Sequence, residues 1–240
     1  MTRRGLWLAA LTALVACRPS AVASTGTTTV TVAGDPRPLQ IRIEPMREGP
    51  LVPLQAQQNV RCGANELLAG VDLALPAEPS PSRRALAFRL RCVEVGLTAG
   101  AVTYGAERVA EWRSLSGGPA EPPGSVTEGV RCPARTAAVD LSITYTQGAT
   151  EPRRGLAGVL LHCANVACQT TGGRVVLWGE VSATPSTLRG DGASAVVACG
   201  GAGDGPIAAV ATGMAFVPEG DGDGDPGAVG PLCSLVSLAR

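Results

Sequence analysis

The middle of the chain reads VRCPARTAAVDLSITY at residues 130–145 and GVLLHC at residues 158–163. Apolar and polar side chains alternate along residues 139–145, and again along residues 39–44, which read LQIRIE. Alternation of this kind is typical of half-buried β-strands. The 31 glycines and 19 prolines are scattered along the chain, which favours short strands joined by turns over long helices. We therefore expect an all-β fold.

Six cysteines divide the chain into three similar units. They form pairs separated by 30, 31 and 34 residues, and the first cysteines of successive pairs lie 70 and 67 residues apart. An apolar residue lies four before each closing cysteine and a valine three after it. Such fixed spacing predicts tandem repeats, with cores near residues 60–95, 130–166 and 197–236. We predict one disulfide in each unit: Cys62–Cys92, Cys132–Cys163 and Cys199–Cys233.

The second unit carries a family resemblance. Cys132-Pro133-Ala134 and residues 158–163 resemble the opening and closing segments of the threefold repeat in vitelline membrane outer layer proteins, and Trp112 and Trp178 are similar to that family's inter-repeat tryptophans. The resemblance covers residues 50–238 and implies a β-prism, in which three antiparallel sheets face a shared core around a pseudo-threefold axis. The repeat period is longer than in that family. Another β-sandwich or barrel is the alternative.

The first residues of the chain are typical of an export signal. Positive charge at residues 2–4 precedes an apolar run at residues 6–16, which is shorter than the roughly 20 residues that a membrane-spanning helix needs. Leu14-Val15-Ala16-Cys17 resembles the bacterial lipobox, which implies cleavage before Cys17 and lipid modification of its thiol. Cleavage after Ala23 by the general signal peptidase is the alternative.

The expected organisation is a signal peptide at residues 1–16, a lipidated Cys17, and a tether to residue 35 whose composition cannot supply a core. Residues 36–240 suffice for one all-β domain. Arg18 stands where aspartate would signal inner-membrane retention. We therefore expect a protein of the cell envelope, held by its lipid anchor in the outer membrane of a Gram-negative bacterium.

Apart from Cys17 and the six paired cysteines, the chain has one more cysteine, Cys168, which has no equivalent in the other units. We expect a free thiol there, with an intermolecular disulfide or pairing with Cys163 as the alternatives. A metal site is not expected beside it, because His162 and Cys163 are successive residues of a strand and point to opposite faces.

Candidates for catalysis are few. His162 is the only histidine, and no Gly-x-Ser-x-Gly or other nucleophile motif accompanies it. Asp72 and Asp140 each lie in a Val-Asp-Leu triplet, and by these flanks they hold equivalent positions in the first two units, which favours a scaffold role. We expect no catalytic residue and no cofactor.

Two sets of side chains are candidates for ligand binding. Asp221, Asp223 and Asp225 place three carboxylates at alternating positions, which suits an oxygen-coordinated Ca²⁺. A solvated turn is the alternative interpretation of these residues. Four aromatic residues could stack on a sugar ring, but we expect the tryptophans to serve the core: Trp112, Trp178, Tyr104 and Tyr145.

Positive and negative side chains balance at 20 each, so no electrostatic argument supports a nucleic-acid partner. The relatives implied by the resemblance are extracellular coat or carbohydrate-associated proteins. The leading hypothesis is a non-enzymatic, lipid-anchored envelope protein that binds a surface glycan or a protein. A purely structural surface lipoprotein and a hydrolase using His162 or paired carboxylates are the alternatives.

Overall fold

The computed structural model describes the residues 40–45, 58–78, 84–98, 101–115, 123–146, 155–171, 174–181, 186–188, 192–195, 199, 204–217 and 229–239. These residues form fifteen strands and no helix, which confirms the all-β prediction. Among them, no helical segment has the length and apolar character needed to cross a membrane. The expected signal peptide, Cys17, the tether and the three candidate calcium ligands, Asp221, Asp223 and Asp225, lie outside the described residues.

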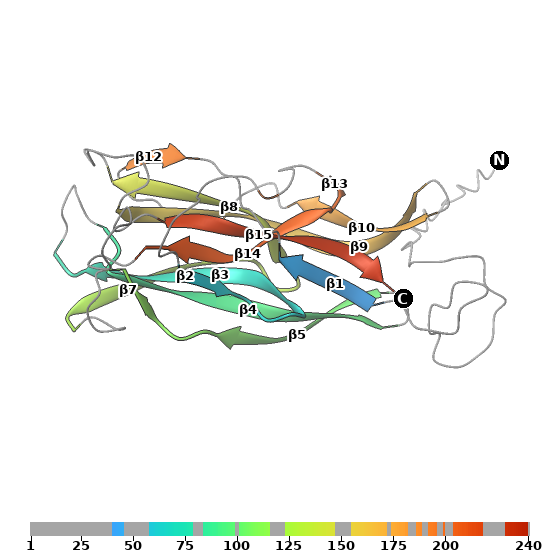
Figure 1. The fold of residues 1–240 in the computed structure, drawn as a ribbon, viewed down its shortest axis with the longest axis horizontal. Helices are drawn as coiled ribbons and strands as arrows, with labels where there is room; N and C mark the ends of the chain where they lie inside the picture. Colours follow the sequence, from blue (N-terminus) through green and yellow to red (C-terminus); the bar gives the residue numbers. More distant parts are fainter. Residues whose placement is uncertain are drawn as a thin grey trace, which may run out of the picture.

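The strands form three antiparallel sheets that run along the long axis of the molecule (Figure 1). The first has the order β5-β4-β3-β7, with β6 on β4: β3 Glu66–Pro76, β4 Ala87–Thr98, β5 Ala101–Val109, β6 Arg113–Ser114 and β7 Ser125–Arg131. The second has the order β12-β8-β9-β10-β13, with β11 on β9: β8 Ala137–Thr146, β9 Leu156–Thr171, β10 Arg174–Val181, β11 Ser186–Leu188, β12 Gly192–Ala195 and β13 Gly205–Pro206. The third has the order β1-β15-β14-β2: β1 Gln40–Pro45, β2 Gln58–Arg61, β14 Ala209–Phe216 and β15 Val229–Ala239.

Each sheet is centred on one hairpin, β3–β4, β8–β9 or β14–β15, and the three hairpins share an irregularity. Each closing cysteine pairs with the residue just before a register shift in the first strand: Leu68 with Cys92, Ala138 with Cys163 and Ala211 with Cys233. A bulge of this kind bends a strand and increases its twist. The units therefore repeat in backbone geometry as well as in sequence.

The disulfides join the cysteines that the spacing pairs. The Cα atoms lie 5.6 Å apart in Cys62–Cys92, 5.5 Å in Cys132–Cys163 and 5.3 Å in Cys199–Cys233. Each bond ties the start of a unit to the second strand of its own hairpin. The three hairpins are therefore braced in the same way.

The strand that precedes each opening cysteine belongs to the sheet of a different unit. β7 ends just before Cys132 and pairs with β3, while β12 precedes Cys199 and pairs with β8. β2 ends just before Cys62 and pairs with β14, which joins the start of the domain to its last unit. This exchange links the sheets in a closed ring. The sheets hold five, six and four strands, so the repetition is approximate, and the β-prism itself stays a prediction.

The core consists of two apolar clusters, and all three sheets contribute to both. In β4, Leu90 and Cys92 belong to the first cluster, whereas Val93 and Val95 belong to the second. Neighbouring strand residues point to opposite faces of a strand. Cys92 and Val93 are neighbours that both point into the core, so the inward face of β4 changes at its closing cysteine. In β9 the same change falls between Cys163 and Ala164.

This change of face explains one difference from the sequence expectation. Residues 139–145 alternate like a half-buried strand, but all of them except Thr144 are buried. The reason is that β8 lies between β12 and β9 and contributes to both clusters. The alternation in residues 39–44 does match a half-buried strand, since Ile41 and Ile43 are half-buried between exposed polar neighbours in β1.

Candidate functional site

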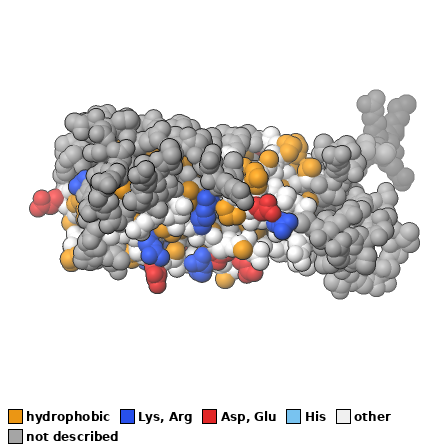
Figure 2. Space-filling model, viewed as in Figure 1, with side chains coloured by type: hydrophobic (Ala, Val, Ile, Leu, Met, Phe, Trp, Pro, Cys, Tyr) orange, Lys and Arg blue, Asp and Glu red, His pale blue; other side chains and the backbone are white. Residues whose placement is uncertain are grey.

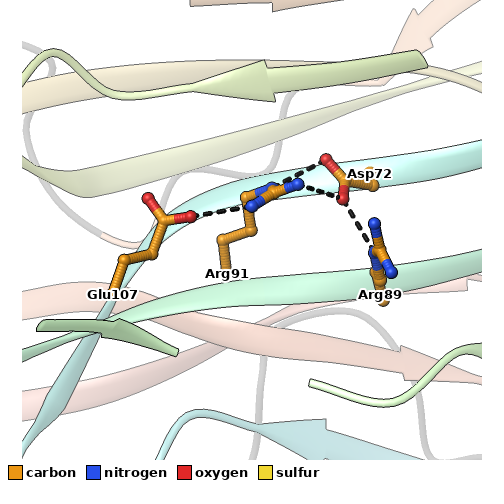
Figure 3. A network of polar contacts seen from close by, with 4 residues as sticks. All are labelled: Asp72, Arg89, Arg91 and Glu107. Atoms are coloured by element: carbon orange, nitrogen blue, oxygen red, sulfur yellow. Dashed lines mark hydrogen bonds and ion pairs between the residues drawn. The ribbon is translucent and has the colours of Figure 1, made fainter. Parts of the chain in front are cut away.

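Asp72 lies at the centre of an ion-pair network that spans β3, β4 and β5 (Figure 3). Its carboxylate accepts hydrogen bonds at 2.8 and 2.7 Å from Nε and Nη2 of Arg91, and at 2.8 Å from Nε of Arg89. Nη1 of Arg91 donates to Glu107 at 2.8 Å. Burial alone would raise the pKa of Asp72, but the hydrogen bonds from the two arginines hold this pKa below its ordinary value. The carboxylate is 2 % exposed and fully engaged, so the geometry favours a scaffold role.

Trp112 is part of the same scaffold and lies outside the two main clusters. Its ring packs with Ala74 and Ala87 in a small separate cluster. The guanidinium carbon of Arg89 lies 4.5 Å from the ring centroid, within the range of a cation–π contact. The expectation that Trp112 is buried is correct, but its partners are on the outer face of the first sheet.

The expected equivalence of Asp72 and Asp140 is wrong. Asp72 pairs with Arg89, three residues before Cys92, whereas Asp140 pairs with His162, one residue before Cys163. The two Val-Asp-Leu triplets are therefore offset by two residues relative to the bulge. The sequence does carry a signal of this offset, because Asp72 lies ten residues after Cys62 whereas Asp140 lies eight residues after Cys132. The matching flanks of the two triplets conceal it.

His162 is half-buried and stands opposite Asp140 in the β8–β9 pairing. The Asp140 carboxylate accepts hydrogen bonds from the amides of Leu141 at 2.8 Å and Cys199 at 3.0 Å. Burial raises the pKa of Asp140, partly offset by these hydrogen bonds and by the charge of His162. Among the described residues, no serine hydroxyl or free thiol is hydrogen-bonded to His162.

Cys168 is a free thiol, 3 % exposed, packed in the second cluster. Pairing with Cys163 does not occur, because Cys163 is bonded to Cys132. Among the described residues, the one group with metal-ligand spacing is Cys62, Glu66 and Cys92. Its two sulfur atoms are joined in a disulfide, so they cannot act as thiolate ligands.

The outer face of β9 and β10 gathers polar side chains around Trp178. Successive residues of β9 alternate, so the inward Ala164, Val166 and Cys168 leave the intervening positions on the opposite face. Trp178 pairs with Ala167 on this face, and Glu180 pairs with Asn165. These residues line a cavity of about 350 Å³: Asn165, Ala167, Gln169, Trp178, Glu180 and Asp204.

The position of Trp178 corrects the sequence expectation. Trp178 was expected in the core, but it is half-buried on the outer face, and its neighbour Leu177 enters the second cluster instead. The sequence does contain a signal for this arrangement, because Gly172-Gly173 separates two strand-like runs and predicts a hairpin. What it lacks is the facing of each run, which depends on the face change near Cys163.

Two further cavities each share one lining residue with the Trp178 cavity. Asn165 also lines a cavity of about 590 Å³ between β5 and the turn before β8, together with Tyr104 and Arg135. Asp204 also lines a cavity of about 320 Å³ that reaches Val139 and Cys199. The cavity that reaches Val139 lies on the inner side of β10, toward which Gly179 and Val181 point, so it is separate from the outer face. The Trp178 cavity and the cavity lined by Tyr104 and Arg135 share Asn165 and extend over β5, β9 and β10. We call these two cavities together the Trp178 groove.

The walls of the Trp178 groove are held by backbone contacts. The Tyr104 hydroxyl accepts a hydrogen bond from the amide of Val166 at 2.9 Å, and burial raises the pKa of this tyrosine. The Asp204 carboxylate accepts from the amide of Val181 at 2.7 Å. Tyr145, by contrast, lies in the first cluster and donates to the Val229 carbonyl at 2.7 Å. Of the two tyrosines, only Tyr104 is available to the groove.

The chemistry of the Trp178 groove suits a sugar better than an apolar ligand. An indole face can stack on the C–H face of a pyranose ring, while amides and carboxylates exchange hydrogen bonds with hydroxyl groups. The side chains of Asn165, Gln169 and Glu180 have no hydrogen-bond partner among the described residues, so their polar atoms remain available. The face of the molecule drawn in Figure 2 carries scattered charges of both signs, in keeping with the balanced composition.

Comparison with known proteins finds no match among family models, curated proteins or solved structures. The candidate site therefore rests on the chemistry and geometry of the residues themselves.

Proposed function

We propose that this protein is a non-enzymatic, lipid-anchored protein of the Gram-negative outer membrane whose β domain binds a surface glycan. The observation that carries this proposal is Trp178, a half-buried indole surrounded by Asn165, Gln169, Glu180 and Asp204 in one cavity. Aromatic residues of this kind supply a large contact area at low entropic cost, and the surrounding polar groups would fix the orientation of the ring.

Other features support the proposal. The lipobox resemblance at residues 14–17 predicts an anchor that would keep the domain at the cell surface or in the periplasm. The family resemblance in the second unit points to extracellular coat or carbohydrate-associated relatives. Both buried aspartates are engaged: Asp72 accepts hydrogen bonds from two arginines, and Asp140 accepts them from two backbone amides. These features favour binding over hydrolysis.

A glycan array probed with the mature domain tests the proposal. We expect a restricted set of glycans to bind, and we expect Trp178→Ala to abolish this binding while the thermal unfolding midpoint stays close to that of the wild type. Trp178→Phe is the matched control, because it keeps an aromatic face at the same position.

No glycan signal above background would contradict the proposal, and it would favour a protein partner or a structural role. Equal binding by the wild type and Trp178→Ala would locate the glycan site elsewhere. A hydrolytic activity that disappears in His162→Ala would contradict the non-enzymatic part.

A further inference from the structure

Arg135 has a backbone conformation that distinguishes it from all other described residues except glycines. Its φ is 63°, in the left-handed region, where an L-residue with a side chain is disfavoured. It lies in the turn before β8, which is closed by hydrogen bonds from the amide and the hydroxyl of Thr136 to the Pro133 carbonyl. Residues held in this region persist only where the surrounding structure imposes it, and they cluster at ligand sites.

The repeat itself does not require this conformation. In the first unit the corresponding turn is closed in the same way, by the amide of Glu66 donating to the Gly63 carbonyl. Asn65 stands where Arg135 stands, three residues after the opening cysteine, and its φ is not positive. Asparagine tolerates the left-handed region better than arginine does. Of the first two units, only the second therefore has a left-handed residue at this position.

The charges along the Trp178 groove are arranged unevenly. Arg135 is exposed and is the one charged residue lining the cavity that also contains Tyr104 and Asn165. Within the described part of the chain, it has no ion-pair or hydrogen-bond partner. The charged residues that line the Trp178 cavity are both acidic, Glu180 and Asp204. Asn165, shared by both cavities, marks the boundary between the cationic and the acidic parts.

We propose that Arg135 binds a carboxylate of the ligand, so that the bound glycan is acidic and lies in one direction along the groove. A neutral or amino sugar stacks on Trp178, and the carboxylate of an adjoining uronic acid residue meets Arg135. A planar guanidinium matches a carboxylate with two parallel hydrogen bonds. The opposite direction would bring the carboxylate against Glu180 and Asp204, which repel it. This inference rests on the proposed function of Trp178.

Titration calorimetry with tetrasaccharides matched in length tests the inference: an N-acetylglucosamine tetramer, and a chain that alternates N-acetylglucosamine with glucuronate. We expect the wild type to bind the acidic chain about tenfold more tightly, as one charge-assisted pair can provide. We expect Arg135→Gln to remove this preference and leave binding of the neutral chain unchanged. Trp178→Ala should weaken both ligands.

The matched control is Arg131→Gln, which removes an exposed arginine that does not line the cavity. It should keep the preference for the acidic chain. If the wild type binds both tetrasaccharides equally, or if Arg135→Gln keeps the preference, the role of Arg135 is wrong and the proposed function stands. If the wild type binds no saccharide, neutral or acidic, the proposed function fails and the inference fails with it.

Discussion

The Asp140 carboxylate accepts a hydrogen bond from the backbone amide of Cys199 at 3.0 Å. At the other two junctions between units, the amide of the opening cysteine donates to a bulge carbonyl instead. Cys132 donates to Ala69 at 2.8 Å, and Cys62 donates to Thr212 at 2.8 Å. An aspartate side chain therefore replaces a main-chain acceptor at one of three equivalent positions.

Glycine occupies the position of Asp140 in the other units. A Cβ atom on Gly70 would lie 2.7 Å from the Val130 carbonyl oxygen, and one on Gly213 would lie even closer to the Val60 carbonyl oxygen. Both glycines are thus required by the close approach of β7 or β2. Asp140 cannot allow the same approach, and the cavity lined by Val139 and Cys199 lies at this junction.

We expect the effect of Asp140→Asn on the free energy of unfolding, relative to the wild type, to be more favourable at neutral pH than at acidic pH. Burial raises the pKa of Asp140, so its stabilising contribution is present below the pKa of the unfolded chain and is lost as pH rises through the folded pKa. The asparagine oxygen can still accept from the Cys199 amide but carries no charge. Urea unfolding at several pH values measures the difference in free energy between variant and wild type.

That difference should favour the variant more at pH 7 than at pH 4. Because this free-energy difference is taken between the variant and the wild type, the titration of groups common to both proteins cancels. A difference that is constant with pH would show that Asp140 is not penalised for its charge in the folded state.

We expect Asp72→Ala to lower the free energy of unfolding by about 3–5 kcal/mol, because it leaves Arg91 buried without its carboxylate. The pKa of Asp72 is held low, so its contribution is present above the pKa of the unfolded chain, about 3.9, and is lost as pH falls through the folded pKa. The loss should therefore be large at pH 7 and should shrink in acid.

Glu66→Gln provides the comparison, since Glu66 pairs with the exposed Arg108. An ion pair in that setting contributes at most about 1 kcal/mol. Equal losses in the two variants would mean that burial does not strengthen the Asp72 network.

The cysteine pairs are predictable from the sequence because each bond joins residues at nearly constant offsets within a unit, such as Cys62 and Cys92. The pairing of β2 with β14 is not predictable from the sequence, because these strands are distant along the chain and their contact depends on the closed ring of sheets. The facing of Trp178 is not predictable from the sequence, for a related reason. It depends on the change of face in β9, which residue types alone do not mark.

We expect Arg135→Gly to raise the free energy of unfolding by about 1 kcal/mol, because glycine adopts a positive φ without the steric cost that a side chain incurs. Arg135→Ala should give no such gain, since alanine keeps the Cβ atom. Thermal and urea unfolding of the two variants measure this contrast. If Arg135→Ala were the more stable variant, the left-handed conformation would not be costly.

The free thiol of Cys168 leads to a prediction about the number of reactive thiols in the mature protein. The same experiment tests the proposed lipid anchor at Cys17. Cys168 is 3 % exposed and the six repeat cysteines are bonded, so the folded protein should resist thiol reagents and the unfolded protein should expose one thiol. Lipidation would occupy the thiol of Cys17, and Cys17→Ser should abolish the incorporation of labelled palmitate without changing this count. Mass spectrometry of the unfolded, alkylated protein, with and without Cys168→Ala, assigns the thiol. A second reactive thiol in the mature chain would indicate an unmodified Cys17, whereas palmitate incorporation that survives Cys17→Ser would place the anchor elsewhere.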